Sequence, residues 1–325
     1  MNTLRDIRFT ISVVSILAGA VALYHLFVQK AAEYVGPANE TSSDPTSAPA
    51  KCMPVPVLDR LVCILAQNNI DPSKMDYGQS DVRDLTAFLV PLVFLLTVEA
   101  SRVGNSGSLL VCMPFIAVVA CLFGGGTYLL IFFAPLMNYS RNRIMRTLGA
   151  SNIPSARLYA ILVANLALIK FMPTAGTKQE GGAYYWALVL MGLLWFIYSP
   201  LTRLFEVLAE EETHVAEEIE EEIKTHQLVR DSFLFMGAVN VLGGSTPLWH
   251  IYNSYYGPLS LRWDLFCAIG ASWLWVLSEA EGLAYQVFFI LISVLFPGGG
   301  LMLFASDREL VLIDHVRSLS AKRAQ

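Results

Sequence analysis

Apolar runs of about twenty residues recur along the chain, and they constrain its fold more than any other feature. They cover residues 8–27, 84–100, 107–136, 155–173, 183–205, 232–250, 263–280 and 284–305. Hydrophobic residues make up 55% of the chain and charged residues only 15%, whereas soluble domains average about 25% charged residues. An α-helix of this length can cross about 30 Å of hydrocarbon, and in lipid the backbone of such a run must be helical. We therefore expect an all-α fold, a polytopic transmembrane bundle of about eight helices.

The polar segments divide the chain into three parts. Residues 1–83 are expected to hold one transmembrane helix and a long loop, which is rich in Pro, Ser and Thr and partly disordered. Residues 84–310 are expected to form a seven-helix bundle, and residues 311–325 a C-terminal tail. Within the bundle, the glutamate-rich segment 206–229 is expected to be a solvated helix outside the membrane, with a regulatory or partner-binding role as the alternative.

The long loop leaves two questions open. Cys52 and Cys63 can form a disulfide if the loop lies in an oxidising lumen, and are otherwise two unrelated thiols. The Lys and Arg residues outside the apolar runs favour cytoplasmic termini only slightly, so they do not decide the orientation.

One apolar run ends in three polar side chains. Residues 85–105 read LTAFLVPLVFLLTVEASRVGN, which places Glu99, Arg102 and Asn105 at i, i+3 and i+6 of one helix. This spacing allows Glu99 and Arg102 to pair. A charged group at the edge of hydrocarbon is costly and therefore marks a candidate functional site, although anchoring at the membrane interface is the simpler alternative.

An eight-helix topology brings further polar residues to the same end of the bundle. His250, Asp264 and Arg308 each lie at or near the end of an apolar run on that side. A carboxyl group in the tryptophan-rich, partly apolar setting of Asp264 tends to stay protonated and can act as a strong acid. Glu99 should instead stay ionised beside Arg102.

Motifs of several enzyme classes are absent from the sequence. It contains no DDxxD metal motif, no P-loop, no GxSxG nucleophile motif and no CxxC or Cys/His metal spacing. We therefore expect neither a metal ion nor a cofactor. The two GGG segments, at 124–126 and 298–300, are expected to permit helix bending or close helix packing.

Six short motifs, in order, resemble a known family. They are TVEASRVGN, GGGTYLLIFFAPLMNYS, ALIKFMPT, PLWHIYNSYY, LRWDLFCAIGASWLW and FPGGGLMLFASDREL. Over residues 85–310 the chain is thereby similar to the fungal integral-membrane terpene cyclases of meroterpenoid and drimane-type pathways, such as the ascofuranone and macrophorin types. Ala100 and the position of Pro297-Gly298-Gly299 depart from the family pattern.

The resemblance implies an activity and a set of site residues. Such enzymes protonate an epoxide or a terminal olefin of a farnesyl-type prenyl chain and ionise no diphosphate. Asp264 would be the proton donor, and Glu99 an alternative donor or the base that ends the cascade. The implied positioning and cavity-lining residues are Arg102, Asn105, His250, Trp263, Trp273 and Trp275.

The resemblance also implies partners and a location. A prenylated small molecule and the lipid bilayer would be the partners, with no nucleic acid. The endoplasmic reticulum membrane follows from the family and from the glycosylation sequon at Asn39. A transporter of a small hydrophobic metabolite is the alternative, but transporters commonly contain internal repeats and midplane charges, and the sequence shows no repeat.

Overall fold

The computed structural model describes residues 2–35, 79–105, 108, 126–171, 215–243, 247–249, 259–280 and 282–323. Within these ranges the chain forms eight α-helices and one 3-10 helix, and no strand. The α-helices are α1 (Asn2–Val35), α3 (Gln79–Ser101), α5 (Gly126–Ile144), α6 (Ser155–Phe171), α8 (Val215–Leu242), α10 (Leu259–Glu279), α11 (Leu283–Leu295) and α12 (Pro297–Arg323). The 3-10 helix η1 (Val103–Asn105) follows α3. The all-helical character agrees with the prediction from sequence.

The predicted transmembrane bundle is wrong for the helices that the structure describes, because none of them has both the length and the apolar character needed to cross a membrane. Two of the apolar runs do not correspond to single helices. The run 284–305 is divided at Pro297, so that α11 has only 13 residues, or about 20 Å of length. The run 232–250 supplies only the second half of α8, whose first half is acidic. The run 183–205 lies outside the described residues.

Two segments that were predicted to be separate from the helices of the bundle belong to continuous long helices in the structure. The glutamate-rich segment, from Val215 where its description begins, forms one helix with the apolar residues that follow it. The segment expected to be a C-terminal tail continues α12 as far as Arg323. Cys52, Cys63 and the sequon at Asn39 lie outside the described residues.

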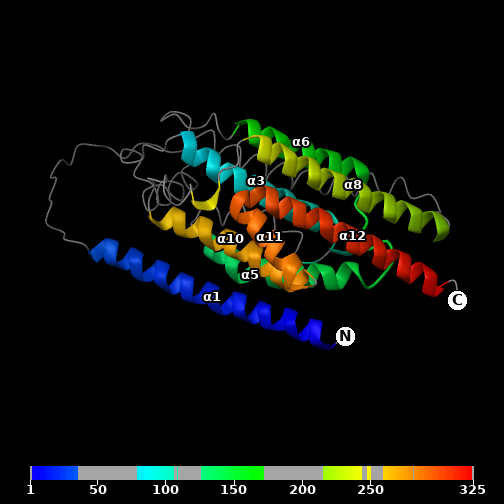
Figure 1. The fold of residues 1–325 in the computed structure, drawn as a ribbon, viewed down its shortest axis with the longest axis horizontal. Coiled ribbons are helices and arrows are strands. Elements are labelled where there is room, and N and C mark those ends of the chain that lie inside the picture. The colour runs from blue at the N-terminus through cyan, green and yellow to red at the C-terminus, as the bar shows by residue number, and fades with distance from the viewer. Residues whose placement is uncertain are drawn as a thin grey trace, which may run out of the picture.

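The long helices run side by side in a bundle (Figure 1). Helix α1 lies along one side, against α5 and α10, and α6 and α8 lie along the opposite side. Helices α3 and α12 lie between them, and α12 packs along α8, α11 and α3. Every described residue of α3 from Phe88 onward is buried, as expected for a central helix that is apolar on all sides.

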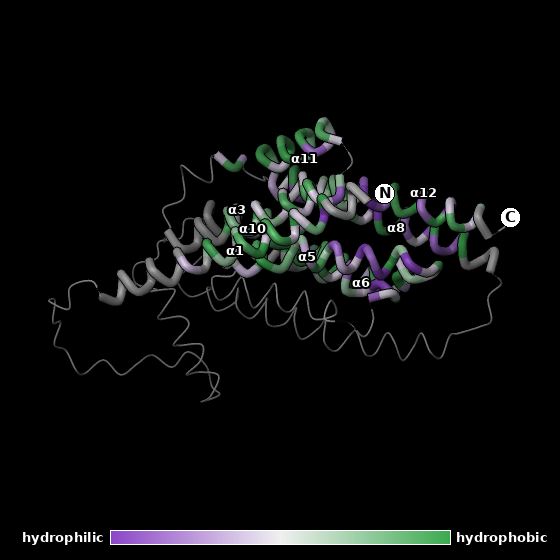
Figure 2. The backbone as a smooth tube through the Cα atoms, turned by 90° about the horizontal axis from the view of Figure 1, so that it is seen from below, coloured by the Kyte–Doolittle hydropathy of each residue, from purple (hydrophilic) through white to green (hydrophobic). Residues whose placement is uncertain are grey.

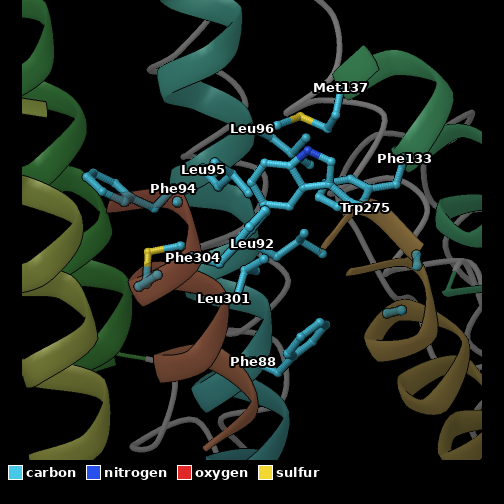
Figure 3. Close-up of a cluster of buried hydrophobic side chains, with 14 of the residues drawn as sticks. Phe88, Leu92, Phe94, Leu95, Leu96, Phe133, Met137, Trp275, Leu301 and Phe304 are labelled. Atoms are coloured by element: carbon cyan, nitrogen blue, oxygen red, sulfur yellow. The ribbon is translucent and has the colours of Figure 1, made fainter. Parts of the chain in front are cut away.

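Trp275 of α10 is at the centre of the core. Its indole lies among Leu96, Phe133 and Met137 (Figure 3), and all four side chains are at most 1% exposed. The indole packs edge-on against the rings of Phe133 and Phe304, with centroids 5.7 and 4.8 Å apart. These contacts join α3, α5, α10 and α12 in one core.

Glycines allow the start of α12 to pass close to α3, as the sequence predicted for residues 298–300. A Cβ atom built on Gly298 would overlap the carbonyl oxygen of Ala87 and lie 2.8 Å from Cγ of Pro91. Only a residue without a side chain fits this approach between the two helices.

We expect Gly298→Ala to lower the free energy of unfolding by about 1–3 kcal/mol, because the added methyl group overpacks the contact. Denaturant unfolding measures the change. Gly270→Ala is the matched control, since its Cβ would meet no atom nearer than Leu130 Cδ1 at 3.8 Å. Equal stability of Gly298→Ala and the unchanged protein would contradict the close approach of α12 to α3.

Candidate functional site

Charged side chains from neighbouring helices meet in a buried network around Glu99. Its Oε1 atom accepts hydrogen bonds from Arg102 Nε and Arg308 Nη1, each at 2.7 Å, and its Oε2 atom accepts one from the Ser140 hydroxyl at 2.7 Å. Asn105 Nδ2 donates to Ser140 Oγ and to the carbonyl oxygen of Glu99. The pairing of Glu99 with Arg102 that the sequence predicted is confirmed.

Three further charged residues extend this network. Arg308 Nε donates to Glu279 Oε2 at 2.9 Å, and Arg141 Nη1 donates to the same oxygen at 3.4 Å. Arg102 Nη2 donates to Glu309 Oε1. Glu279 and Arg141 belong to α10 and α5, so the network connects α3, α5, α10 and α12. Each charge has at least one opposite partner, without which its burial would be prohibitively costly.

His226 of α8 joins the network from a helix that the sequence analysis assigned to solvent. Its Nδ1 atom lies 2.6 Å from Glu309 Oε2, and its Nε2 atom lies 2.8 Å from Ser151 Oγ. The Ser151 hydroxyl also donates to Glu222 Oε1. A serine, a histidine and a glutamate in this order suggest a nucleophilic site. However, Ser151 is only 2% exposed and its hydroxyl is engaged by Glu222, so the arrangement supports the bundle rather than a reaction.

The spacing of residues along α8 indicates that His226 is buried, although the glutamate-rich composition of the segment suggests a solvated helix. Glu222, His226, Val229 and Phe233 recur at helical spacing and are each at most 1% exposed, so they mark the buried face of α8. The surrounding glutamates made the whole segment look solvated. The buried face can be recognised only if the helical spacing of Val229 and Phe233 is extended toward the N-terminus, to His226 and Glu222.

Glu99 is ionised in this setting. Burial opposes its charge, but Arg102 and Arg308 outweigh that cost and lower the pKa of Glu99 to about 2. Burial likewise opposes the charge of Glu309, and Arg102 followed by the contact with His226 lowers its pKa below the usual range. Glu99 thus fits an ion-pair partner or a base better than an acid, and its catalytic role stays a prediction.

Folding stability should depend on this charge at acid pH. The folded pKa of Glu99 lies below the ordinary value of 4.5, so its contribution is complete above about pH 4.5 and is lost as pH falls toward about 2. We expect Glu99→Gln to weaken the fall in unfolding free energy between these values, measured by urea unfolding. Glu220→Gln, at a glutamate 70% exposed in its surface pair with Lys224, is the control. A fall in Glu99→Gln as steep as in the unchanged protein would contradict the assignment.

The start of α10, where two of the predicted site residues lie, is far along the helix from the network around Glu99. Asp264 and Trp263 lie at the start of α10, where the structure describes the helix but not these side chains, and His250 lies outside the described residues. Helix α10 joins the network through Glu279, fifteen residues beyond Asp264 and about 22 Å along the helix. The direction of α10 therefore separates Asp264 from the network, and its role as proton donor stays a prediction.

Two of the predicted cavity-lining tryptophans belong to the packed interior. Trp275 is fully buried, and the guanidinium carbon of Arg308 lies 5.7 Å from its ring centroid. Trp273 is partly buried and packs against the core. Neither tryptophan lines the groove between α8, α11 and α12.

This groove has a volume of about 530 Å³ and lies between α8, α11 and α12. Figure 2 shows α11 at the edge of the bundle, coloured mostly as hydrophobic. The walls are largely apolar, and the lining residues are Arg230, Leu234, Ala284, Tyr285, Phe288, Phe289, Leu303, Ser306, Asp307 and Leu310.

One acid and one cation face the groove without pairing. Burial raises the pKa of Asp307, and the charge of Arg230 opposes this rise. Arg230 Nε is buried and has no hydrogen-bond partner among the described residues. Asp307 could not be predicted from the sequence, because three adjacent charged residues do not show that Arg308 and Glu309 turn into the network whereas Asp307 turns into the groove.

Comparisons of the chain with protein families, with curated proteins and with solved structures find no match. The resemblance to terpene cyclases stays a prediction.

Proposed function

We propose that the protein is a terpene cyclase that closes rings in a prenyl chain by protonating an epoxide or a terminal olefin. One observation carries the proposal beyond the sequence resemblance. The groove between α8, α11 and α12 combines a single carboxyl group with aromatic and aliphatic walls, and its volume is within the usual range of small-molecule sites.

Asp307 has the properties that a proton donor needs. It is partly buried, and burial raises its pKa against the effect of Arg230, so the protonated form is favoured more than for an exposed aspartate. A carboxyl group that stays protonated beside a bound prenyl chain can donate its proton to an epoxide oxygen or to an alkene carbon.

The aromatic rings beside Asp307 suit the cations that follow protonation. The rings of Tyr285 and Phe288 lie 5.9 and 5.2 Å from that of Phe289, measured between centroids. Phe289 in turn lies 5.0 Å from Phe304 of the core. Ring faces attract a passing carbocation through cation–π interaction, and the buried end of the series holds the exposed rings in place.

The reaction is a balanced isomerisation. Asp307 gives its proton to the epoxide oxygen or to the terminal alkene carbon, the C–O bond or the π bond breaks, and the next double bond supplies the electrons of the new ring bond. The last cation loses a proton to a base. Return of that proton to the Asp307 carboxylate restores the acid, so no oxidant, reductant or nucleotide is consumed.

The test is product formation by the full chain from a farnesylated phenol and from its terminal epoxide. We expect a cyclic isomer of one of the two, identified by mass spectrometry and NMR. In D₂O, olefin protonation leaves one deuterium on carbon, whereas epoxide opening leaves it on an exchangeable hydroxyl. Absence of any cyclic isomer across a panel of prenyl chain lengths and head groups would refute the proposal.

A further inference from the structure

The groove holds a positive charge that no described residue neutralises by direct contact. Arg230 forms no ion pair within the described part of the chain, and its Nε atom is buried without a hydrogen-bond partner. A buried guanidinium donor left unpaired is costly. A ligand atom that accepts this hydrogen bond would remove the cost.

The walls beside Arg230 are apolar. Leu234 follows one turn later on α8, and Leu303 and Leu310 of α12 line the same groove. A ligand that satisfies both Arg230 and these walls must carry a negative head on an apolar chain. One arginine without a second cation in the lining matches a single negative charge.

We propose that the groove binds an amphiphile with one negative charge, whose head pairs with Arg230, and that Asp307 takes up a proton from solvent when this anion binds. The proposal rests on the function proposed above and assigns its substrate class: a prenyl chain on a carboxylate or a phenolate.

Charge coupling within the groove gives the reason for proton uptake. In the free protein, Arg230 partly offsets the effect of burial on the Asp307 carboxyl. An anion on Arg230 cancels that stabilisation of the Asp307 carboxylate and adds a second negative charge nearby. The substrate would in this way convert Asp307 into the acid that the reaction requires.

The other charged groups around α12 do not supply this coupling. The titratable and charged residues that line the groove are Arg230 from α8, Tyr285 from α11 and Asp307 itself. The described charges next to α12 on its opposite face are Glu99, Arg102 and Glu279, which are paired with Arg308 and Glu309. Asp231 of α8 is exposed and is absent from the lining.

The test uses binding alone, so it is independent of catalysis. The probe is decanesulfonate below its micelle concentration, because a sulfonate does not titrate between pH 4 and 8 and any pH dependence then belongs to the protein. Decanol and decyltrimethylammonium are the neutral and cationic counterparts. Calorimetry of the full chain in two buffers of different ionisation enthalpy measures the affinity and the number of protons taken up.

We expect the sulfonate to bind at least about tenfold more tightly than decanol, the effect of one charge-assisted hydrogen bond. Its affinity should rise as pH falls, with net proton uptake. Arg230→Gln should remove the preference, Arg230→Lys should retain part of it, and Asp307→Asn should abolish proton uptake while keeping the anion. Lys224→Gln, which removes an exposed charge of α8 outside the groove, should change neither.

Equal affinity for the sulfonate and decanol in the unchanged protein would overturn the inference, and so would binding without proton uptake. Both measurements need no variant, so misfolding of Arg230→Gln cannot obscure them. If the anion binds as expected but no substrate is cyclised, the proposed function fails and the binding site remains. If substrates are cyclised without any preference for the anion, only the inference fails.

Discussion

Asp307→Asn should lower the rate of cyclisation at least about 100-fold, since general acid catalysis typically contributes 10² or more. Asparagine keeps the size of the side chain and can donate a hydrogen bond, but it has no acidic proton to transfer. The groove should therefore still bind substrate, and the loss should appear in kcat. Initial rates measured on the substrate that the unchanged protein cyclises check this result.

Asp314→Asn is the matched control for this variant. Asp314 lies on the same helix and its side chain is 77% exposed in a surface pair with Arg317, so full activity is expected. Asp264→Asn separates the two candidate donors. Unchanged cyclisation by Asp307→Asn together with loss in Asp264→Asn would move the proton donor to α10.

Arg308→Met should lower the free energy of unfolding by about 3–5 kcal/mol, the usual cost of removing one partner from a buried ion pair. Arg308 is 4% exposed and pairs with Glu99 and Glu279. Methionine fills much of the space but leaves both carboxylates with one fewer cation. Chemical unfolding monitored by circular dichroism measures the change.

Two further variants make this prediction specific to charge. Arg317→Met on the same helix removes an arginine that is 61% exposed and should change stability by less than about 0.5 kcal/mol. Adding Glu99→Gln to Arg308→Met should recover part of the loss, because it removes one of the uncompensated charges. Additive losses in the double variant would contradict the pairing of Glu99 with Arg308.

The features that depend on neighbouring residues could be predicted from the sequence. Glu99 and Arg102 are one helical turn apart, so their pairing follows from helix geometry alone. The helical character follows from the long apolar runs, and the close packing at Gly298 follows from the absence of side chains at 298–300.

The features that depend on packing between distant helices could not be predicted from the sequence. Arg308 and Glu99 are 209 residues apart, and His226 and Glu309 are 83 apart, so no local pattern joins them. Hydropathy summed over a window also does not show where a helix breaks. Pro297 divides one apolar run into two helices. The buried face of α8 contains both the apolar Phe233 and the charged Glu222.

Covalent trapping tests the central claim, that Asp307 delivers the proton in this groove, most directly. The probe is a prenyl terminal epoxide in which the next double bond is saturated, so that opening of the epoxide cannot be followed by ring closure. After Asp307 protonates the oxygen, its own carboxylate is the nearest nucleophile and forms an ester with the epoxide carbon. Peptide mass spectrometry should find the mass of the probe added at Asp307, and no label in Asp307→Asn. Label at Asp264 or Glu99 with none at Asp307 would contradict the account.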